Sequence, residues 1–96
     1  MLLGKVIGTV VSTQKEDRLK GFRLCILQQV DVNNRPREET IVAVDSVGSG
    51  IGEIVLYATG SSARQTKLTE NKPVDAVIIA IVDTWEVDGK TKYSKD

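Results

Sequence analysis

The segment from residue 76 to residue 82, AVIIAIV, is apolar at every position. In an antiparallel strand over a single core, apolar residues occupy alternate positions, because successive side chains point to opposite faces of the sheet. One face can therefore pack on a core, which leaves a second face formed by Val77, Ile79 and Ile81. Leaving these three side chains in water would forfeit about 5 to 9 kcal/mol, at roughly 1.5 to 3 kcal/mol each, an amount comparable to the whole stability of a small domain. We therefore expect a second copy of the chain to cover Val77, Ile79 and Ile81 at a subunit interface.

Five segments rich in Val, Ile and Leu divide the chain, at residues 2–13, 22–31, 40–45, 53–59 and 76–87. Stretches containing Gly, Pro, Asn, Asp and Ser separate them, as is typical of turns. The pattern predicts an all-β meander closed into one small five-stranded barrel, a single domain of residues 1–96. Residues 61–67 predict one short helical turn, with Ser61 as its N-terminal cap. The pair Asp88 and Gly89 predicts a C-terminal hairpin whose second strand lies at residues 90–93.

Charge and length exclude several classes of partner. The 96 residues carry 13 Lys and Arg and 13 Asp and Glu side chains, so the formal net charge is zero. Such a chain lacks the basic surface that binds nucleic acid or an anionic membrane. The N-terminal segment, with Lys5 inside its apolar pattern, is typical of a strand rather than of a signal peptide, and no apolar run reaches the roughly 18 residues of a membrane span. We expect a cytoplasmic protein.

The composition disfavours catalysis and metal binding. The chain has no histidine, and its single cysteine, Cys25, lies in the apolar stretch RLCILQQV, so we interpret it as a core residue in a reducing compartment. Asp45, Glu53, Asp75 and Asp83 stand at the ends of predicted strands, where the ordinary role of a carboxylate is to accept hydrogen bonds from loop amides. We expect no catalytic residue, no metal site and no cofactor.

Gly48, Gly50 and Gly52 form a cluster that invites comparison with phosphate-binding loops. A dinucleotide-binding loop leads into a long helix, whose N-terminus supplies amides and a dipole to the pyrophosphate. The segment that follows here, EIVLYAT, predicts a strand, and no Gly-Lys-Ser/Thr sequence is present. The cluster instead predicts a tight connection between strands, with positive φ angles or a close approach of backbone to backbone.

Four motifs, GKVIGTVVSTQK, VAVDSVGSGIGE, VLYATGSSARQT and PVDAVIIAIVDTWEVDGK, resemble in order and spacing the bacterial microcompartment vertex proteins of the EutN/CcmL type. The resemblance covers almost the whole chain. Ser49 departs from it, because an alanine is expected between the two glycines, but the change exchanges one small residue for another. The linker VNNRPREETI and the terminal motif look more like those of metabolic microcompartments than those of carboxysomes.

The resemblance implies an OB-like barrel that assembles as a homopentamer and caps the vertices of a shell made with hexameric shell proteins. It implies that the loop of Gly48, Ser49 and Gly50 converges on the five-fold axis, where only small residues let five backbones come close. It also implies that the helical turn packs at the subunit boundary through the candidate residues Ser61, Ser62 and Arg64, the last as a partner for a neighbour's carboxylate or carbonyl groups. Loops 15–21 and 33–39 would face a neighbouring hexamer.

A second function remains open, because a five-stranded OB-like barrel can also bind single-stranded nucleic acid or another ligand. Such binding uses exposed aromatic side chains and a basic groove. Aromatic residues make up only 4% of this chain, and it has no basic excess. We therefore favour the structural role and expect no nucleic-acid partner.

Overall fold

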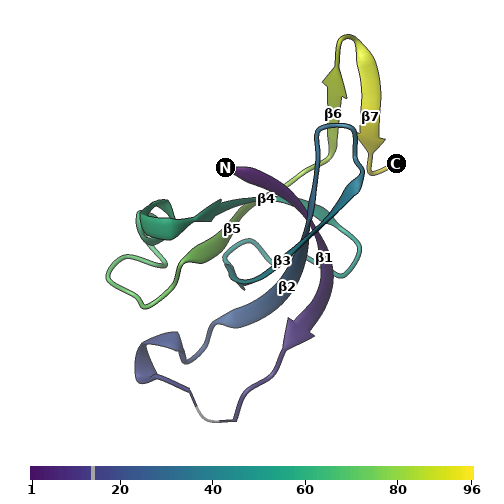
Figure 1. Cartoon of the computed structure of the whole chain (residues 1–96). Coiled ribbons are helices and arrows are strands. Elements are labelled where there is room, and N and C mark those ends of the chain that lie inside the picture. Colours follow the sequence, from purple (N-terminus) through teal and green to yellow (C-terminus); the bar gives the residue numbers. More distant parts are fainter. Residues whose placement is uncertain (14) are drawn as a thin grey trace.

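The computed structural model describes residues 1–13 and 15–96, so Gln14 of the first motif lies outside the described residues. Five strands close into a barrel and a separate hairpin follows (Figure 1). This arrangement confirms the predicted fold class. The barrel strands are β1 (Leu2–Val10), β2 (Arg23–Val30), β3 (Pro36–Asp45), β4 (Ile54–Thr59) and β5 (Ala76–Ile81). The hairpin strands are β6 (Thr84–Val87) and β7 (Lys90–Ser94), and the short 3-10 helices are η1 (Asp17–Leu19) and η2 (Gly60–Arg64).

The barrel closes in the order β1, β2, β3, β5, β4 and back to β1. The first three strands form the predicted antiparallel meander, but β4 pairs with β1 and β5 rather than with β3. The long connection that contains η2 brings β5 between β3 and β4, and β3 then pairs with β5 in parallel. A simple meander is therefore wrong for the last two strands of the barrel, and the observed order is that of an OB-like barrel.

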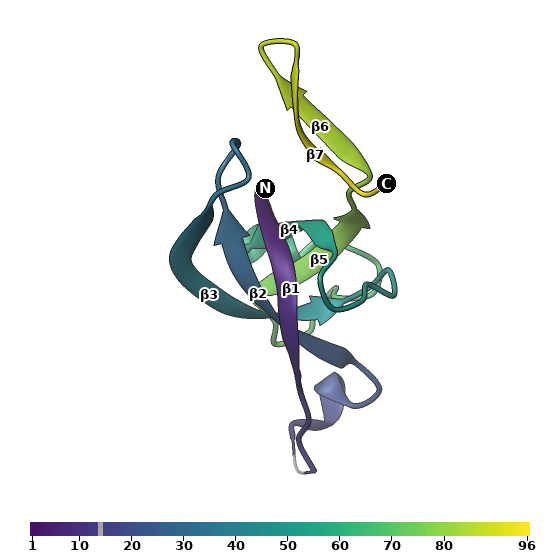
Figure 2. The ribbon, with the colours of Figure 1, turned by 90° about the vertical axis from the view of Figure 1, so that its right-hand side faces the viewer.

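The last apolar segment of the sequence is two strands rather than one. β5 ends at Ile81, and β6 begins at Thr84 in a separate sheet that projects from the barrel (Figure 2). The hairpin turn has positive φ angles at Asp88 (52°) and Gly89 (73°), as a type I′ turn requires, so the predicted C-terminal hairpin is confirmed. β3 begins at Pro36, four residues before the predicted start, because the strand continues through the exposed segment PREE and Pro36 pairs with Val30 of β2 beyond a register shift.

A β-bulge in β5 changes which residues face the barrel interior. Leu56 pairs with Ala80 and Tyr57 pairs with Ile78, so the register skips Ile79. Because one extra residue reverses the alternation of faces, Ile81 packs against the same interior cluster as Ile78. The prediction that Ile81 shares an outward face with Val77 and Ile79 is therefore wrong.

The barrel interior is a cluster of fully or almost fully buried side chains. Its members are Val6, Cys25, Leu27, Ala43, Val55, Tyr57, Ala76 and Ile78. Cys25 has no exposed surface, which confirms its assignment to the core. Burial raises the pKa of its thiol, so the reactive thiolate form is disfavoured.

A second apolar cluster lies on the outer face of β5, where Val44, Ala63, Val74 and Val77 are buried together. Ile79 packs against this cluster with Leu19, Phe22, Leu24 and Ala58. The chain's own helices η1 and η2 and the loop before β5 therefore cover Val77, where a second subunit was expected. Val77 is completely buried in the single chain, so it is removed from the candidate interface.

The short helix η2 begins at Gly60, whose φ angle is +64° and whose amide donates to the Asp75 carbonyl at 2.7 Å. Its N-terminal cap is Thr59, without a side-chain capping hydrogen bond, so Ser61 is not the cap that was predicted. The helix ends at Arg64, three residues earlier than expected. None of the helices in the described parts of the chain is long and apolar enough to cross a membrane.

Candidate functional site

Asp45, at the end of β3, organises the glycine loop of residues 46–53. Its Oδ1 accepts hydrogen bonds from the amides of Val47 and Gly48 at 3.0 and 3.1 Å, and its Oδ2 accepts one from the Ser49 amide at 2.8 Å. The guanidinium of Arg23 donates to the same Oδ2 at 2.7 Å and also to the Ser49 carbonyl. One carboxylate therefore fixes the first half of the loop.

The Asp45 side chain is only 1% exposed, and burial by itself would raise its pKa. Hydrogen bonds from the Val47 amide, Arg23 and Ser49 outweigh this effect, so the pKa of Asp45 lies below its ordinary value. The carboxylate therefore stays ionised and keeps its acceptor capacity.

Glu53 holds the second half of the loop in the same way. Its Oε1 accepts a hydrogen bond from the Gly50 amide at 2.5 Å, and its Oε2 accepts one from the Lys95 ammonium group at 2.5 Å. The pKa of Glu53 is lowered, first by the hydrogen bond from Lys95 and then by the Gly50 amide. The backbone of β1 anchors the loop end, because the Gly52 amide donates to the Val6 carbonyl at 2.8 Å.

These contacts confirm that Asp45 and Glu53 accept hydrogen bonds from loop amides. Sequence reasoning missed Arg23 and Lys95, which complete the two supports. Neither stands near the loop in sequence, since Arg23 belongs to the preceding hairpin and Lys95 follows the last strand. No short sequence motif places either residue next to the glycine loop.

The three glycines of the loop have different roles. Gly48 and Gly52 have φ angles of +77° and +90°, which confirms the predicted turn conformation at these two positions. Gly50 does not have a positive φ angle, and a Cβ atom built on it would stand 3.3 Å from the Glu53 Oε1. Among the axis candidates, Gly48 is exposed, Gly50 is half-buried and Ser49 is buried.

The η2 turn presents Ser61, Ser62 and Arg64 to solvent around the buried Ala63. The Arg64 guanidinium donates to the carbonyl of Val74 at 3.1 Å, within its own chain. The structure thus ties this turn to the segment that leads into β5. Ser61, Ser62 and Arg64 therefore lie on one exposed turn, which the Arg64 hydrogen bond joins to the loop of residues 73–75.

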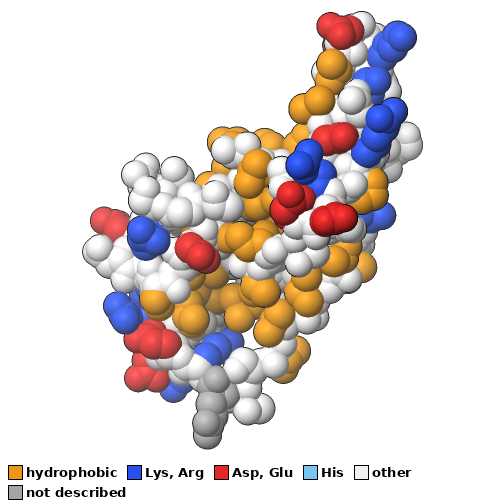
Figure 3. Space-filling model, in the orientation of Figure 1, with side chains coloured by type: hydrophobic (Ala, Val, Ile, Leu, Met, Phe, Trp, Pro, Cys, Tyr) orange, Lys and Arg blue, Asp and Glu red, His pale blue; other side chains and the backbone are white. Residues whose placement is uncertain are grey.

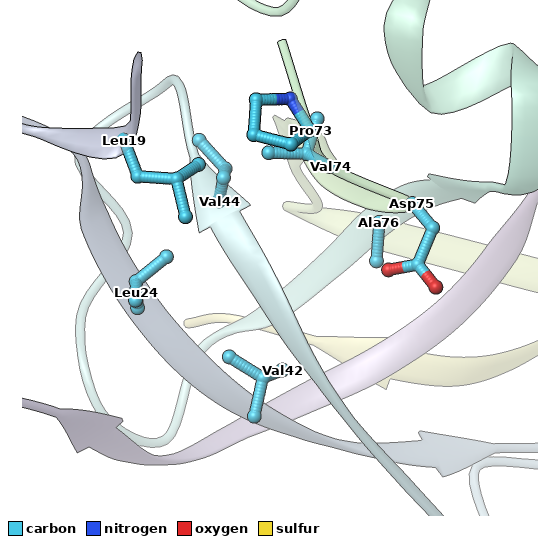
Figure 4. A pocket seen from close by; sticks show the side chains of 8 residues that line it. All are labelled: Leu19, Leu24, Val42, Val44, Pro73, Val74, Asp75 and Ala76. Carbon is cyan, nitrogen blue, oxygen red and sulfur yellow. The ribbon is translucent and has the colours of Figure 1, made fainter. Parts of the chain in front are cut away.

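An open apolar groove of about 220 Å³ runs beside this loop (Figure 4). Its lining residues are Leu19, Leu24, Val42, Val44, Pro73, Val74, Asp75 and Ala76. Asp75 is its single titratable lining residue. Across residues 1–13 and 15–96, no three His, Cys, Asp or Glu side chains are grouped so that they could hold a metal ion.

The four aromatic side chains do not form a stacking platform on the barrel surface. Tyr57 is buried in the interior, and Phe22 packs against the second cluster. Trp85 and Tyr93 stack on each other across the hairpin, with ring centroids 5.3 Å apart. This distribution does not favour binding of single-stranded nucleic acid.

Comparison with known proteins gives consistent matches along the chain. The sequence-family model described as "Ethanolamine utilisation protein EutN/carboxysome" matches residues 1–83. The carboxysome shell vertex protein CcmL of Gloeobacter violaceus is 47% identical over 95 residues, which are 99% of this chain and 95% of that protein. Its solved structure superposes with a TM-score of 0.94 over 99% of this chain and 98% of that one.

Relatives from other microcompartments match as well. The shell vertex protein GrpN of Rhodospirillum rubrum is 48% identical over 86 residues, 90% of this chain and 97% of that protein. A GrpN structure described as a pentameric microcompartment shell protein superposes with a TM-score of 0.84 at 47% identity, over 91% of this chain and 99% of that one. The shell vertex protein EutN of Salmonella typhimurium is 39% identical over 95 residues, 99% of this chain and 96% of that protein.

The similarity to CcmL does not support the expectation of a non-carboxysome shell. The carboxysome protein of Gloeobacter violaceus matches at 47% identity, whereas the microcompartment shell vertex protein EutN matches at 39%. The expectation drawn from the linker and the terminal motif is therefore not supported.

Proposed function

Because the chain belongs to the EutN/CcmL family, we propose that it is a shell vertex protein that assembles as a ring of five and closes the vertices of a bacterial microcompartment. The observation that carries this proposal is the match along 99% of the chain to proteins named shell vertex proteins. The GrpN relative, described as pentameric, supports the five-fold ring. The role is structural and requires no catalysis.

The geometry of a closed shell explains why such a ring is needed. Hexagonal tiles by themselves form flat sheets, and a closed polyhedral shell needs five-fold units at its vertices. Hexameric shell proteins are therefore the proposed partners around the rim of the ring. The proposed contacts are residues 15–21 around η1 and residues 33–39, which form the turn before β3 and the start of that strand, because both segments carry exposed charged side chains.

The glycine loop is the proposed axial element of the ring. Its fixed backbone suits this place, since Asp45 and Glu53 hold it from both ends. Gly48 is exposed and has no side chain, so five copies of this tip can approach one axis closely. Ser49 and Gly50, which are less exposed, would support the tip from within.

The subunit boundary is proposed to include the η2 turn and its surroundings. Ser61, Ser62 and Arg64 are exposed there, and Ile79 is the one residue of the predicted outward face that lies outside the barrel interior and keeps some exposure. Val77 is not proposed, because its own chain buries it completely. Ile81 is not proposed, because it packs against the interior cluster of the barrel.

Native mass spectrometry of the purified chain tests the ring directly. Five chains of 10.5 kDa predict an assembly of about 53 kDa. A stable single chain at micromolar concentration would contradict the proposal. Electron microscopy of shells made with and without this chain tests the vertex role, and shells that are sealed and normally shaped in its absence would contradict it.

A further inference from the structure

The C-terminal tail, residues 95 and 96, returns to the barrel. β7 ends at Ser94, and the end of the chain lies beside the base of the hairpin (Figures 1 and 2). The Lys95 amide donates a hydrogen bond to the Asp83 carbonyl at 2.8 Å. Asp83 belongs to the short link between β5 and β6, and the Val82 amide of this link donates to the Ile54 carbonyl at 2.8 Å. The tail is therefore fixed to the point where the chain leaves the barrel.

Glu53 joins this tail to the glycine loop. One of its carboxylate oxygens binds the Lys95 ammonium group and the other binds the Gly50 amide. The Glu53 side chain is 22% exposed and the Lys95 side chain is 43% exposed. In Figure 3, side chains of both charges gather where the hairpin meets the barrel. Because Lys95 holds the carboxylate in one orientation, its loss would let the Glu53 side chain turn to other rotamers, in which Gly50 loses its acceptor.

The two halves of the glycine loop are held by different parts of the chain. Asp45, whose side chain is only 1% exposed, accepts hydrogen bonds from the amides of residues 47–49. This support belongs to the barrel wall, since Asp45 and its partner Arg23 lie on β3 and β2. The support of Gly50 depends instead on the last residues of the chain. Movement of the tail should therefore reach Gly50 and leave residues 47–49 in place.

The hairpin has a second attachment to the barrel. The Trp85 Nε1 donates a hydrogen bond to the Val32 carbonyl, in the turn between β2 and β3, at 2.8 Å. Trp85 also stacks on Tyr93, two residues before Lys95. Within residues 1–13 and 15–96, β6 and β7 pair only with each other, so no strand ladder fixes the hairpin to the barrel. The position of Lys95 is therefore linked to the position of the whole hairpin.

We propose that the C-terminal tail is a strap that closes the glycine loop. With Lys95 on Glu53, the Gly50 half of the loop is held, and displacement of the hairpin or of the tail releases this half while Asp45 retains the other. A single partly exposed ion pair separates the two states. Every contact of the strap lies within one chain, so the inference does not depend on the proposed ring.

Exchange of individual loop amides with water, measured by nuclear magnetic resonance on the full chain, tests the strap. Lys95→Met should speed the exchange of the Gly50 amide about twofold to fivefold and leave that of the Ser49 amide unchanged. Lys95→Arg should keep the slow exchange, because it retains a cation at this position. Lys90→Met is the matched control, since it removes the same charge from the opposite end of β7, and it should change neither amide.

Trp85→Phe tests the link between the hairpin and the loop. This variant keeps an aromatic ring against Tyr93 but removes the donor to the Val32 carbonyl. The exchange of the Gly50 amide should become faster, by less than in Lys95→Met, because Lys95 is still present. Unchanged exchange of Gly50 in Trp85→Phe would overturn the link to the hairpin.

The other failures are distinguishable. Unchanged exchange of the Gly50 amide in Lys95→Met, or an equal increase at Ser49, would overturn the strap. Each variant should keep the native mass of the wild type, and a changed mass in Lys95→Met would place Lys95 in a contact between chains and also overturn the strap. A wild-type chain with the mass of one subunit would contradict the proposed ring alone, because the strap is tested in the same way in a single chain.

Discussion

Arg23 and Asp45 occupy directly paired positions on β2 and β3, and the Arg23 Nη1 lies 2.7 Å from the Asp45 Oδ2. The same carboxylate accepts hydrogen bonds from three backbone amides of the glycine loop. This cross-strand pair therefore connects the wall of the barrel to the loop that we place at the axis. The barrel fixes the loop through a salt bridge that is buried on the carboxylate side and partly exposed on the arginine side.

Asp45→Asn should destabilise the fold. The amide group has one acceptor oxygen where the carboxylate has two, so the loop amides and Arg23 lose hydrogen bonds to a buried, charged acceptor, at a cost of about 1 to 3 kcal/mol. Urea unfolding monitored by circular dichroism measures the change. Asp17→Asn is the control, because the Asp17 side chain is 88% exposed and its replacement should leave the midpoint unchanged. Equal midpoints for the two variants would show that Asp45 does not stabilise the loop.

The contribution of Asp45 should depend on pH with a defined sign. Its pKa in the folded chain is lowered, so the folded state binds fewer protons at this site than the unfolded state does. The stability difference between wild type and Asp45→Asn should be constant above the ordinary aspartate value of 3.8 and should shrink as the pH falls below it. Unfolding curves from neutral to acid pH measure this difference, and a difference that grows toward acid pH would contradict the assignment.

Lys95→Met should raise the pKa of Glu53, because the hydrogen bond from Lys95 is the main cause of its lowering. Titration of the Glu53 carboxyl carbon by nuclear magnetic resonance measures the pKa directly. Lys90→Met removes a charge from the same hairpin without touching Glu53, and it should leave the titration unchanged. A Glu53 pKa that is the same in wild type and Lys95→Met would mean that the tail does not contact the loop in solution.

Gly48→Ala should destabilise the chain more than Gly50→Ala. A side chain at a φ angle of +77° is strained, at a cost of about 1 to 2 kcal/mol, whereas Gly50 has no such angle. Thermal unfolding of the two variants compares them. The prediction fails if Gly50→Ala proves the more damaging substitution.

Gly4→Ala should be destabilising because β1 lies very close to the ring of Tyr57. A Cβ atom at Gly4 would stand 2.8 Å from the Tyr57 Cε1, so the buried ring or the strand must shift, which costs about 1 to 3 kcal/mol. Gly8→Ala on the same strand is the control, since its nearest contact is an ordinary 3.4 Å from Ile26. Unfolding midpoints should separate the two variants, and similar values would show that Tyr57 yields without cost.

Local chemistry made several features predictable from the sequence by itself. The turn at Asp88 and Gly89 needs positive φ angles at two adjacent residues, and an Asp-Gly pair favours these angles. The core position of Cys25 follows from the apolar stretch around it, and the acceptor roles of Asp45 and Glu53 follow from carboxylates at the ends of strands. The family was predictable because its motifs are themselves short local strings.

Other features were decided only when distant segments packed together. The bulge at Ile79 turns Ile81 inward, and no sequence pattern marks it, since AVIIAIV is apolar at every position and accepts either register. The cover over Val77 comes from Ala63 and Val74 across a long connection, and Arg23 meets Asp45 through the pairing of two strands. The sequence by itself determined where the five apolar segments of the barrel lie and where the turns between them fall. The tertiary structure decided which face each strand buries and which distant side chains hold the glycine loop, because both depend on register and on contacts between segments far apart in the chain.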